Sequence, residues 1–232
     1  MVSSDPNLSA QIKDILARSP LAALPPALID RLLADAQRID MPMYTTVYDA
    51  GDDPRCALIL SGLIRVYMVA PDGRQVTVRY ARSAELLGLA ALIGGPTPTS
   101  AQMLTDAKLL LLNGRTLQGM GQSEPRVGWV MAREMTQRLF DTLDALATNT
   151  FGTLRQRIAR HLLDMAASSQ HVDTLMAAIS QQELADAVGS VRPVVARILR
   201  DLRADGLIET TKDGIKLLNP EALAAETWTG SV

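Results

Sequence analysis

The sequence predicts an α+β protein in which an N-terminal antiparallel β jelly-roll barrel, a long helix and a C-terminal winged helix-turn-helix follow one another. Three observations support this prediction. Short strand-like runs bounded by glycine and proline fill residues 41–113, a continuous helical pattern begins at Pro125, and two short helices precede a two-strand hairpin between residues 180 and 218. The expected domains are residues 1–124, 125–151 and 152–232.

The composition is consistent with two modest domains in a chain of 232 residues. The net charge is −2, so any nucleic-acid binding must come from a local cluster of positive charge. Cys56 is the only cysteine, which excludes a disulfide within the chain and a four-cysteine iron–sulfur or zinc site, and we predict no metal site. The N-terminus has no signal-peptide pattern and no apolar run could span a bilayer, so we expect a cytoplasmic protein without a membrane partner.

Residues 8–36 predict two or three short helices, because Pro20 and the pair Pro25 and Pro26 interrupt a helical pattern. A change to strand-like runs follows, with turns at residues 51–54, 61–62 and 71–73. Several short strands at this spacing favour a small antiparallel barrel or jelly roll, which is either a solid core or a cup for a ligand. The predicted strands are residues 45–48, 57–60, 63–69, 75–80 and 108–112.

The helix predicted from Pro125 onward has a seam of residues spaced alternately by three and four positions, which is typical of paired helices and predicts a homodimer. A single buried helix would explain the same leucines. Phe140 and Leu143 are expected to point away from the seam, toward the barrel. Gly152 then interrupts the helical pattern as a hinge or a simple linker, before a helix over residues 154–167. The seam consists of Ala132, Met135, Leu139, Thr142, Leu146 and Asn149.

A helix-turn-helix is predicted between Ser180 and Leu207. Ser180 followed three residues later by Glu183 forms the sequence pattern of a capping box, which predicts a helix over residues 181–187. Gly189 gives the turn its conformational freedom, and Ser190 is expected to cap the second helix. Pro193 would then lie in the first turn of that helix, where its missing N–H has no cost.

The second of these helices has one apolar face and one arginine-rich face. Val194, Val195, Ile198, Leu199 and Leu202 recur at helical spacing and are expected to pack on Leu184 and Val188. Guanidinium groups on the other face can bind guanine edges or phosphates in a major groove. A solvated arginine face on an ordinary helical hairpin is the alternative. The arginines are Arg192, Arg197, Arg200 and Arg203.

A wing follows the second helix. Residues 207–211 and 215–218 have strand character, and Asp213-Gly214 between them is a strong hairpin turn. Lys212 and Lys216 lie near this turn, where DNA phosphates are expected. The sequence therefore predicts a winged helix-turn-helix.

Across residues 25–220 this order of elements resembles the cyclic-AMP receptor protein and fumarate–nitrate reductase regulator (CRP/FNR) family of bacterial transcription factors. The resemblance depends on the segment ISQQELADAVGSVRPVVARILRDLRADGLI at 179–208, on residues 157–163, and on the glycines Gly51, Gly62, Gly73 and Gly88. It implies a cyclic-nucleotide-binding-like barrel, a homodimer under allosteric control, and recognition helices in successive major grooves of a pseudo-palindromic DNA site. It also implies RNA polymerase as a partner.

Within the recognition helix, Arg192 and Arg197 match the base-reading arginines of that family, whereas Pro193 replaces its usual glutamate. Proline has no side-chain acceptor for a cytosine amino group, and Val194 could instead contact a thymine methyl group. We therefore expect a different half-site. The predicted DNA-contacting residues are Ser190, Arg192, Pro193, Val194, Arg197, Arg200 and Lys212.

The resemblance also implies that cyclic AMP is not the effector. Leu89 stands where the family has its ribose-binding glutamate, and Thr99 replaces the arginine of the phosphate-binding pair, of which Ser100 remains. A buried phosphate without a matching cation would be costly, although Arg79 or Arg82 could substitute. The predicted pocket residues are Gly88, Leu89, Leu92, Thr99, Ser100, Phe140, Thr142 and Leu143.

Three interpretations of the effector remain open. A small apolar or aromatic molecule could lodge between Leu89, Leu92, Phe140 and Leu143, with Thr142, which matches the family's adenine-contacting threonine, orienting it. Haem is the second interpretation, and no effector is the third. An iron–sulfur cluster is not expected with one cysteine, and Cys56 is interpreted as a buried apolar residue. Haem would require an axial ligand such as His161, His171, Cys56 or a methionine.

An enzyme is not predicted. The sequence has no GxSxG, HExxH, phosphate-loop or dinucleotide-binding motif, and its two histidines do not suggest a catalytic triad. The other alternative is a ligand-binding or interaction protein that does not bind DNA. Steeply salt-dependent DNA binding would distinguish a regulator from both alternatives.

Overall fold

The computed structural model describes residues 6–52, 55–69, 71, 75–168 and 175–227. The chain divides into two compact units, residues 1–140 and 141–232. Among the described helices, none is both long enough and apolar enough to span a membrane.

The first unit begins with short helices that are separated by prolines, as predicted. Pro20 starts the second of them after Ser19, whose hydroxyl accepts a hydrogen bond of 3.2 Å from the backbone N–H of Leu21. Pro25 and Pro26 start the third, since proline is well tolerated in a first helical turn. These helices are α1 (Pro6–Arg18), the 3-10 helix η1 (Pro20–Ala23) and α2 (Pro26–Leu33).

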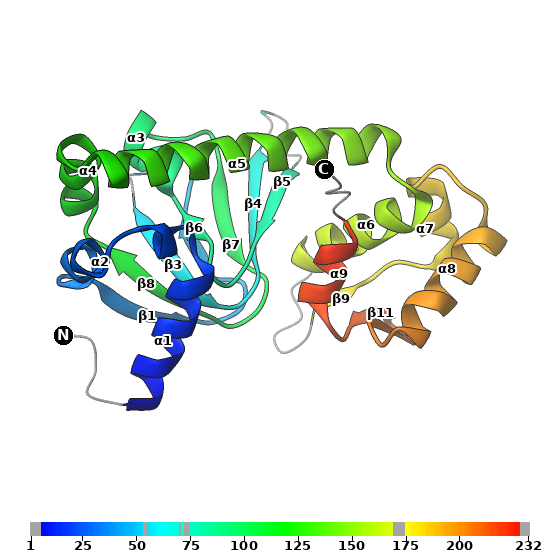
Figure 1. Ribbon diagram of the computed structural model, residues 1–232. Helices are drawn as coiled ribbons and strands as arrows, with labels where there is room; N and C mark the ends of the chain where they lie inside the picture. The colour runs from blue at the N-terminus through cyan, green and yellow to red at the C-terminus, as the bar shows by residue number, and fades with distance from the viewer. Residues whose placement is uncertain (1–5, 53–54, 70, 72–74, 169–174, 228–232) are drawn as a thin grey trace. The chain divides into compact units, whose positions relative to one another are not determined.

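Eight strands form two four-stranded antiparallel sheets, which confirms the predicted barrel (Figure 1). One sheet has the order β1-β8-β3-β6 and the other β2-β7-β4-β5. Five strands agree with the sequence prediction, whereas β1, β6 and β7 were not predicted. The strands are β1 (Gln37–Met41), β2 (Thr46–Tyr48), β3 (Cys56–Ser61), β4 (Ile64–Val69), β5 (Gln75–Ala81), β6 (Leu86–Leu87), β7 (Ser100–Met103) and β8 (Ala107–Leu112).

The two faces of strand β3 belong to two different apolar cores. Ala57 and Ile59 lie in the core between the sheets, whereas Cys56, Leu58 and Leu60 lie in a core shared with the helices. This alternation follows from the two-residue period of a strand. The helices that contribute to the second core are α1, η1, α2, α3 (Leu89–Gly94), α4 (Gly114–Ser123) and the start of α5 (Pro125–Phe151).

Gly88, at the start of α3, is a position where only glycine fits. Its φ is +79°, and a Cβ atom built there would lie 1.8 Å from the carbonyl oxygen of Arg55. The close approach of these two backbone segments therefore explains one of the glycines that support the family resemblance.

The second unit contains the predicted winged helix-turn-helix. Its three-stranded sheet has the order β10-β11-β9, and the β10–β11 hairpin is the wing. The short strand β9 was not predicted. The elements that follow α5 are α6 (Leu154–Ser168), β9 (Met176–Ala177), α7 (Gln181–Ala187), α8 (Arg192–Ala204), β10 (Ile208–Thr211), β11 (Gly214–Leu217) and α9 (Pro220–Glu226).

Candidate DNA-binding surface and effector barrel

The capping box at the start of α7 is present as predicted. The backbone N–H of Ser180 donates to Glu183 Oε2 at 2.9 Å, and the backbone N–H of Glu183 donates to Ser180 Oγ at 3.2 Å. These hydrogen bonds lower the pKa of Glu183. The reciprocal pair fixes where the first helix of the motif begins.

The turn between α7 and α8 differs from the prediction in one detail. Gly189 has the expected positive φ of +64°, and the backbone N–H of Ser190 donates to the carbonyl of Ala185 at 2.8 Å. The prediction that Ser190 caps α8 is wrong, because the residue before the helix is Val191 and no side chain caps it. The backbone N–H of Ser190 instead forms the hydrogen bond at the end of α7. Helix α8 begins at Arg192, with Pro193 in its first turn.

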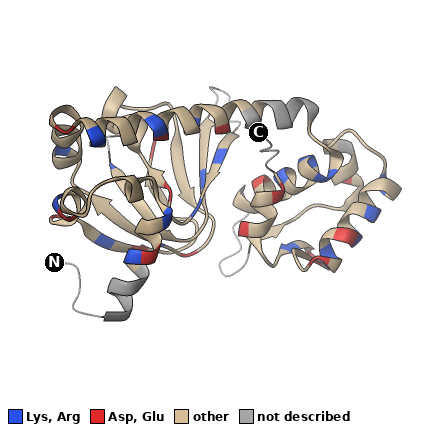
Figure 2. Ribbon diagram, in the orientation of Figure 1, with Lys and Arg blue, Asp and Glu red and all other residues tan. Residues whose placement is uncertain are grey.

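Helix α8 has one buried and one exposed face. Val195, Leu199 and Leu202 are fully buried, as is Leu184 on α7, and Val188 just after α7 is buried. Arg192, Pro193, Arg197, Arg200 and Arg203 are exposed. At 100° per residue the four arginines fall within an arc of about 140°. Figure 2 marks positive positions along α8. We call the four exposed arginines the arginine face of α8.

The wing and the recognition helix are linked. Arg203 Nη1 lies 3.4 Å from Thr210 Oγ1 on β10, in hydrogen-bonding range. Lys212 is exposed at the tip of the hairpin, and Lys216 is partly buried on β11. Lys212 is therefore the better placed of the two lysines for a phosphate contact.

Arg155 at the start of α6 joins three elements of the second unit, which sequence reasoning did not predict. Its guanidinium donates to Glu226 Oε2 at 2.8 Å, to Glu226 Oε1 at 3.0 Å and to Asp205 Oδ2 at 2.7 Å. Asp205 is the C-cap residue of α8, and Glu226 is the last residue of α9. These interactions raise the pKa of Arg155, mainly through Glu226, and fix the C-terminal end of the recognition helix. No local sequence signal marks partners 50 and 71 residues away.

The predicted seam of α5 is largely exposed in the single chain. Leu139 and Leu146 are 57% and 63% exposed, Ala132 and Thr142 are also exposed, and Met135 packs partly against the helical core. The side chain of Asn149 lies outside the described residues. Large apolar side chains left in water are typical of an interaction surface.

The apolar residues of the predicted effector pocket occupy two environments. Leu89 and Leu92 are buried in the core under the helices, whereas Phe140 and Leu143 are each about half exposed on α5. Thr142 is also exposed. A pocket made by all four apolar residues remains a prediction.

The residues at the phosphate-binding positions are hydrogen bonded within the protein. Thr99 Oγ1 lies 2.9 Å from Thr97 Oγ1 and is also hydrogen bonded to Tyr48. Ser100 Oγ accepts from the backbone N–H of Ala50 at 3.1 Å. Burial raises the pKa of Tyr48, and the Thr99 hydrogen bond opposes that effect. These hydroxyls thus connect β7 to the β2 end of the sheet.

A network of charged side chains, which sequence reasoning missed, connects β5 and α5. Arg79 Nη1 lies 2.6 Å from Glu85 Oε2, and Arg138 Nη1 lies 3.1 Å from the same oxygen. Arg138 Nη2 also binds Glu134 Oε1 at 2.5 Å, and the Glu134 side chain is only 5% exposed. Burial lowers the pKa of Arg79, Arg138 acts in the same direction, and Glu85 opposes both. The sequence suggested Arg79 as a substitute for the phosphate-binding cation. In the structure, its guanidinium is already paired with the Glu85 carboxylate.

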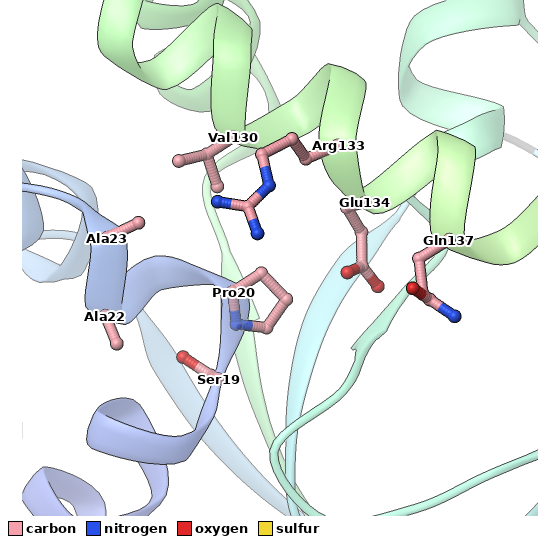
Figure 3. Close-up of a pocket in the computed structure, with 8 residues that line it drawn as sticks. All are labelled: Ser19, Pro20, Ala22, Ala23, Val130, Arg133, Glu134 and Gln137. Carbon is pink, nitrogen blue, oxygen red and sulfur yellow. The ribbon is translucent and has the colours of Figure 1, made fainter. Parts of the chain in front are cut away.

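A separate pocket of about 320 Å³ lies between η1 and α5 (Figure 3). It contains none of the residues predicted to bind the effector. In Figure 3 Arg133 extends from α5 toward η1, and Ser19 lies on the opposite wall. The hydroxyl of Ser19 donates to the carbonyl of Leu16 at 2.8 Å, so it is already used in the fold. The lining residues are Ser19, Pro20, Ala22, Ala23, Val130, Arg133, Glu134 and Gln137.

The possible haem ligands occupy dissimilar positions. His161 on α6 is partly buried, and burial lowers its pKa. Cys56 lies in the core of the first unit, and His171 lies outside the described residues. In the described part of the chain, no three side chains of the His, Cys, Asp and Glu types come together as a metal site.

Cys56 is expected to be unreactive in the folded protein. Its side chain is 0% exposed, and burial, reinforced by Glu134, raises the pKa of its thiol to about 12. At pH 8 the native protein should therefore not react with a disulfide reagent such as DTNB, whereas the denatured protein should release one equivalent of the chromophore. Rapid reaction of the native protein would show that the thiol is accessible and would contradict this expectation.

An antiparallel barrel followed by a winged helix-turn-helix with an exposed arginine face is the architecture of a DNA-binding regulator with an additional β-barrel domain. Residues 40–124 match the family model of the cyclic nucleotide-binding domain, and residues 156–226 match that of the Crp-like helix-turn-helix domain. The chain belongs to the CRP/FNR family of transcriptional regulators.

Several known proteins are similar to this chain. The transcriptional regulator LdrP of Thermus thermophilus is 34% identical over 185 residues, covering 78% of this chain and 92% of LdrP. A CRP-like cAMP-activated global transcriptional regulator of Mycobacterium tuberculosis is 27% identical, covering 91% and 97% of the two chains. The structure of the c-di-GMP-responsive global regulator CLP of Xanthomonas campestris matches with a TM-score of 0.53 and 26% identity, covering 83% of this chain and 99% of CLP.

Proposed function

We propose that this DNA-binding regulator acts as a homodimer whose barrel binds a small organic molecule other than cyclic AMP and thereby controls the placement of the two recognition helices. The main support is the exposed arginine face of α8 on a fully buried winged-helix core. The capping box, the β10–β11 hairpin and the Arg155 ion pairs hold α8 in a fixed position within its unit. A fixed position is needed by a helix that reads DNA but not by an ordinary solvated helix.

In the proposed complex, α8 enters the major groove of a pseudo-palindromic DNA site. Arg192 and Arg197 would bind base edges, and Arg200 and Lys212 would bind phosphates, because all four side chains are exposed on the α8 and wing surface. Pro193 is exposed between the two base-reading arginines and offers no hydrogen-bond acceptor. We therefore propose a half-site that differs from the one read with a glutamate at this position.

The proposed effector is not cyclic AMP, although one relative is described as cAMP-activated and another as c-di-GMP-responsive. Leu89 is only 1% exposed in an apolar core, and it cannot bind a ribose hydroxyl. Thr99 is hydrogen bonded to Thr97 and Tyr48 and supplies no positive charge. A cyclic phosphate bound at Thr99 and Ser100 would have no cation at the position of Thr99, and the nearby Arg79 is already paired with Glu85.

The homodimer is proposed to form through the seam of α5. Leu139 and Leu146 are both more than half exposed in the single chain, and two copies of such a helix can bury each other's leucines. Two recognition helices related by a twofold axis match the symmetry of a palindromic site. RNA polymerase is the proposed protein partner of the bound dimer.

The proposed DNA binding can be tested by selecting bound sequences from a random double-stranded library with the purified protein. We expect enrichment of an inverted repeat whose half-sites differ from those of the cAMP-activated relative. Affinity for the selected site should fall about 10³–10⁵-fold between 50 and 200 mM salt if six to ten phosphates are contacted. Absence of any enriched sequence would contradict sequence-specific binding, and enrichment of the relative's own half-site would contradict the role given to Pro193.

A further inference from the structure

One row of side chains crosses the sheet β2-β7-β4-β5 on the face that points into the barrel. Tyr48 pairs with Ala101, Ala101 with Val66, and Val66 with Arg79. Tyr48, Ala101 and Val66 all belong to the apolar core between the two sheets, so the fourth member of the row, Arg79, shares their face. An arginine therefore projects from β5 toward the barrel interior.

The Arg79 guanidinium is held by a carboxylate that it shares with a second arginine. Glu85 Oε2 lies 2.6 Å from Arg79 Nη1 and 3.1 Å from Arg138 Nη1. The three side chains are only 15%, 25% and 18% exposed for Arg79, Glu85 and Arg138. Two guanidinium groups around one carboxylate oxygen form a site whose geometry suits a carboxylate.

Of the two glutamates in this network, Glu85 is the one that can be replaced. Glu134 is 5% exposed and contacts only Arg138 among the two arginines, whereas Glu85 is 25% exposed and lies in the turn before β6. The backbone of that turn is held by a hydrogen bond of 3.0 Å from the N–H of Ile59 to the carbonyl of Glu85. The Glu85 carboxylate can thus leave by side-chain rotation without a change in the backbone.

The surroundings of Arg79 define the rest of the ligand. Val66 lies beside Arg79 in the row and Ala101 follows Val66 on the next strand, and Leu87 belongs to the same apolar core. Burial lowers the pKa of Arg79, and among the neighbours that oppose this effect is Tyr48, whose hydroxyl is hydrogen bonded to Thr99. A small apolar body with a single acidic group matches these neighbours better than a nucleotide does.

We propose that the effector is a small organic carboxylic acid whose carboxylate takes the place of Glu85 between Arg79 and Arg138. Binding would replace one carboxylate by another, so the charge of the network is conserved while Glu85 is released. Arg138 belongs to α5, and the ligand therefore contacts the helix that contains the proposed dimer seam. This inference rests on the proposed function, because it names the chemical class of its effector.

The test measures whether a ligand carboxylate and the Glu85 carboxylate compete for Arg79 and Arg138. The full-length protein and its Glu85→Gln variant are titrated by calorimetry with acetate, benzoate, phenylacetate and octanoate, and with benzamide and phenylacetamide as uncharged analogues. Since Glu85→Gln removes the competing charge, at least one carboxylate should bind this variant tenfold or more tightly than it binds the wild type. The amides should not bind, and adding Arg79→Gln to Glu85→Gln should abolish carboxylate binding. Glu85→Ala repeats the test if the Gln variant does not fold.

Three outcomes would overturn the inference: no carboxylate binds either Glu85 variant, the wild type and the variants bind equally, or binding persists without Arg79. Arg38→Gln is the control, because Arg38 forms an exposed ion pair with Asp40 on β1. Binding of the wild type to its selected DNA site is measured in parallel. Retained DNA binding without carboxylate binding refutes only this inference, whereas wild-type protein that binds no DNA refutes the proposed function.

Discussion

Replacing Arg192 and Arg197 together with alanine is expected to weaken binding to the selected DNA site by at least about 30-fold, without a change in thermal stability. Each bidentate arginine–guanine pair contributes about 1–3 kcal/mol of discrimination, and two such pairs correspond to about 2–6 kcal/mol. Both side chains are exposed, and the core of α8 consists of other residues, so the fold should be unaffected. Fluorescence anisotropy at one fixed salt concentration measures the affinity, and circular dichroism measures the melting temperature.

A matched control removes the same charge elsewhere. Arg18 and Arg38 form exposed ion pairs with Asp14 and Asp40 in the first unit, and replacing both with alanine also removes two positive charges. We expect this control to bind DNA as the wild type does, because neither residue belongs to the unit that contains α8 and the wing, and exposed charges more than about 10 Å from the DNA are largely screened at physiological salt. An equal loss of affinity in both double variants would mean that overall charge, and not the arginine face of α8, determines binding.

The second unit was predicted well from the sequence because its signals are local. Ser180 and Glu183 lie three residues apart, and the apolar face of α8 repeats within one helix. The hairpin at Asp213 and Gly214 is likewise specified by adjacent residues. Patterns within a short window determine local structure. In α8 the apolar pattern also predicted which face of the helix would expose its arginines.

The barrel was predicted less completely because some of its strands lack a strong pattern. β1 is mostly exposed and has the polar sequence QRIDM, and β6 is two residues long. β7 has the sequence SAQM, in which only Met103 is a large apolar residue. These strands depend on pairing with distant partners, such as β1 with β8, and such pairing cannot be inferred from a short window.

The charged network of the barrel could not be predicted for the same reason. Arg79 and Glu85 are six residues apart, but Arg138 comes from a helix that follows five further elements. Only the strand register places Arg79 on the inner face, and a register shift next to it interrupts the simple alternation. The net charge of −2 gives no indication of the arginine face on α8. It also gives no indication that Arg79 and Arg138 are paired with glutamates in the first unit.

Replacing Leu139 and Leu146 together with glutamate is expected to convert the proposed dimer to a monomer and to weaken specific DNA binding by more than about 100-fold. Burying a leucine contributes about 1.5–3 kcal/mol, and a glutamate in the same interface adds a desolvation cost and like-charge repulsion. DNA affinity depends on dimerisation because one recognition helix reads only one half-site. Sedimentation velocity and anisotropy on the same samples measure the two effects.

Each subunit should still fold after this change, because both leucines are already exposed in the single chain. The matched control replaces Met68 and Ile93, which are 43% and 51% exposed on β4 and α3, with glutamate. It adds the same charge outside the predicted seam of α5, and we expect it to remain a dimer and to bind DNA. A dimeric Leu139 and Leu146 variant would place the interface elsewhere, whereas a monomeric variant with full DNA affinity would separate DNA recognition from dimerisation.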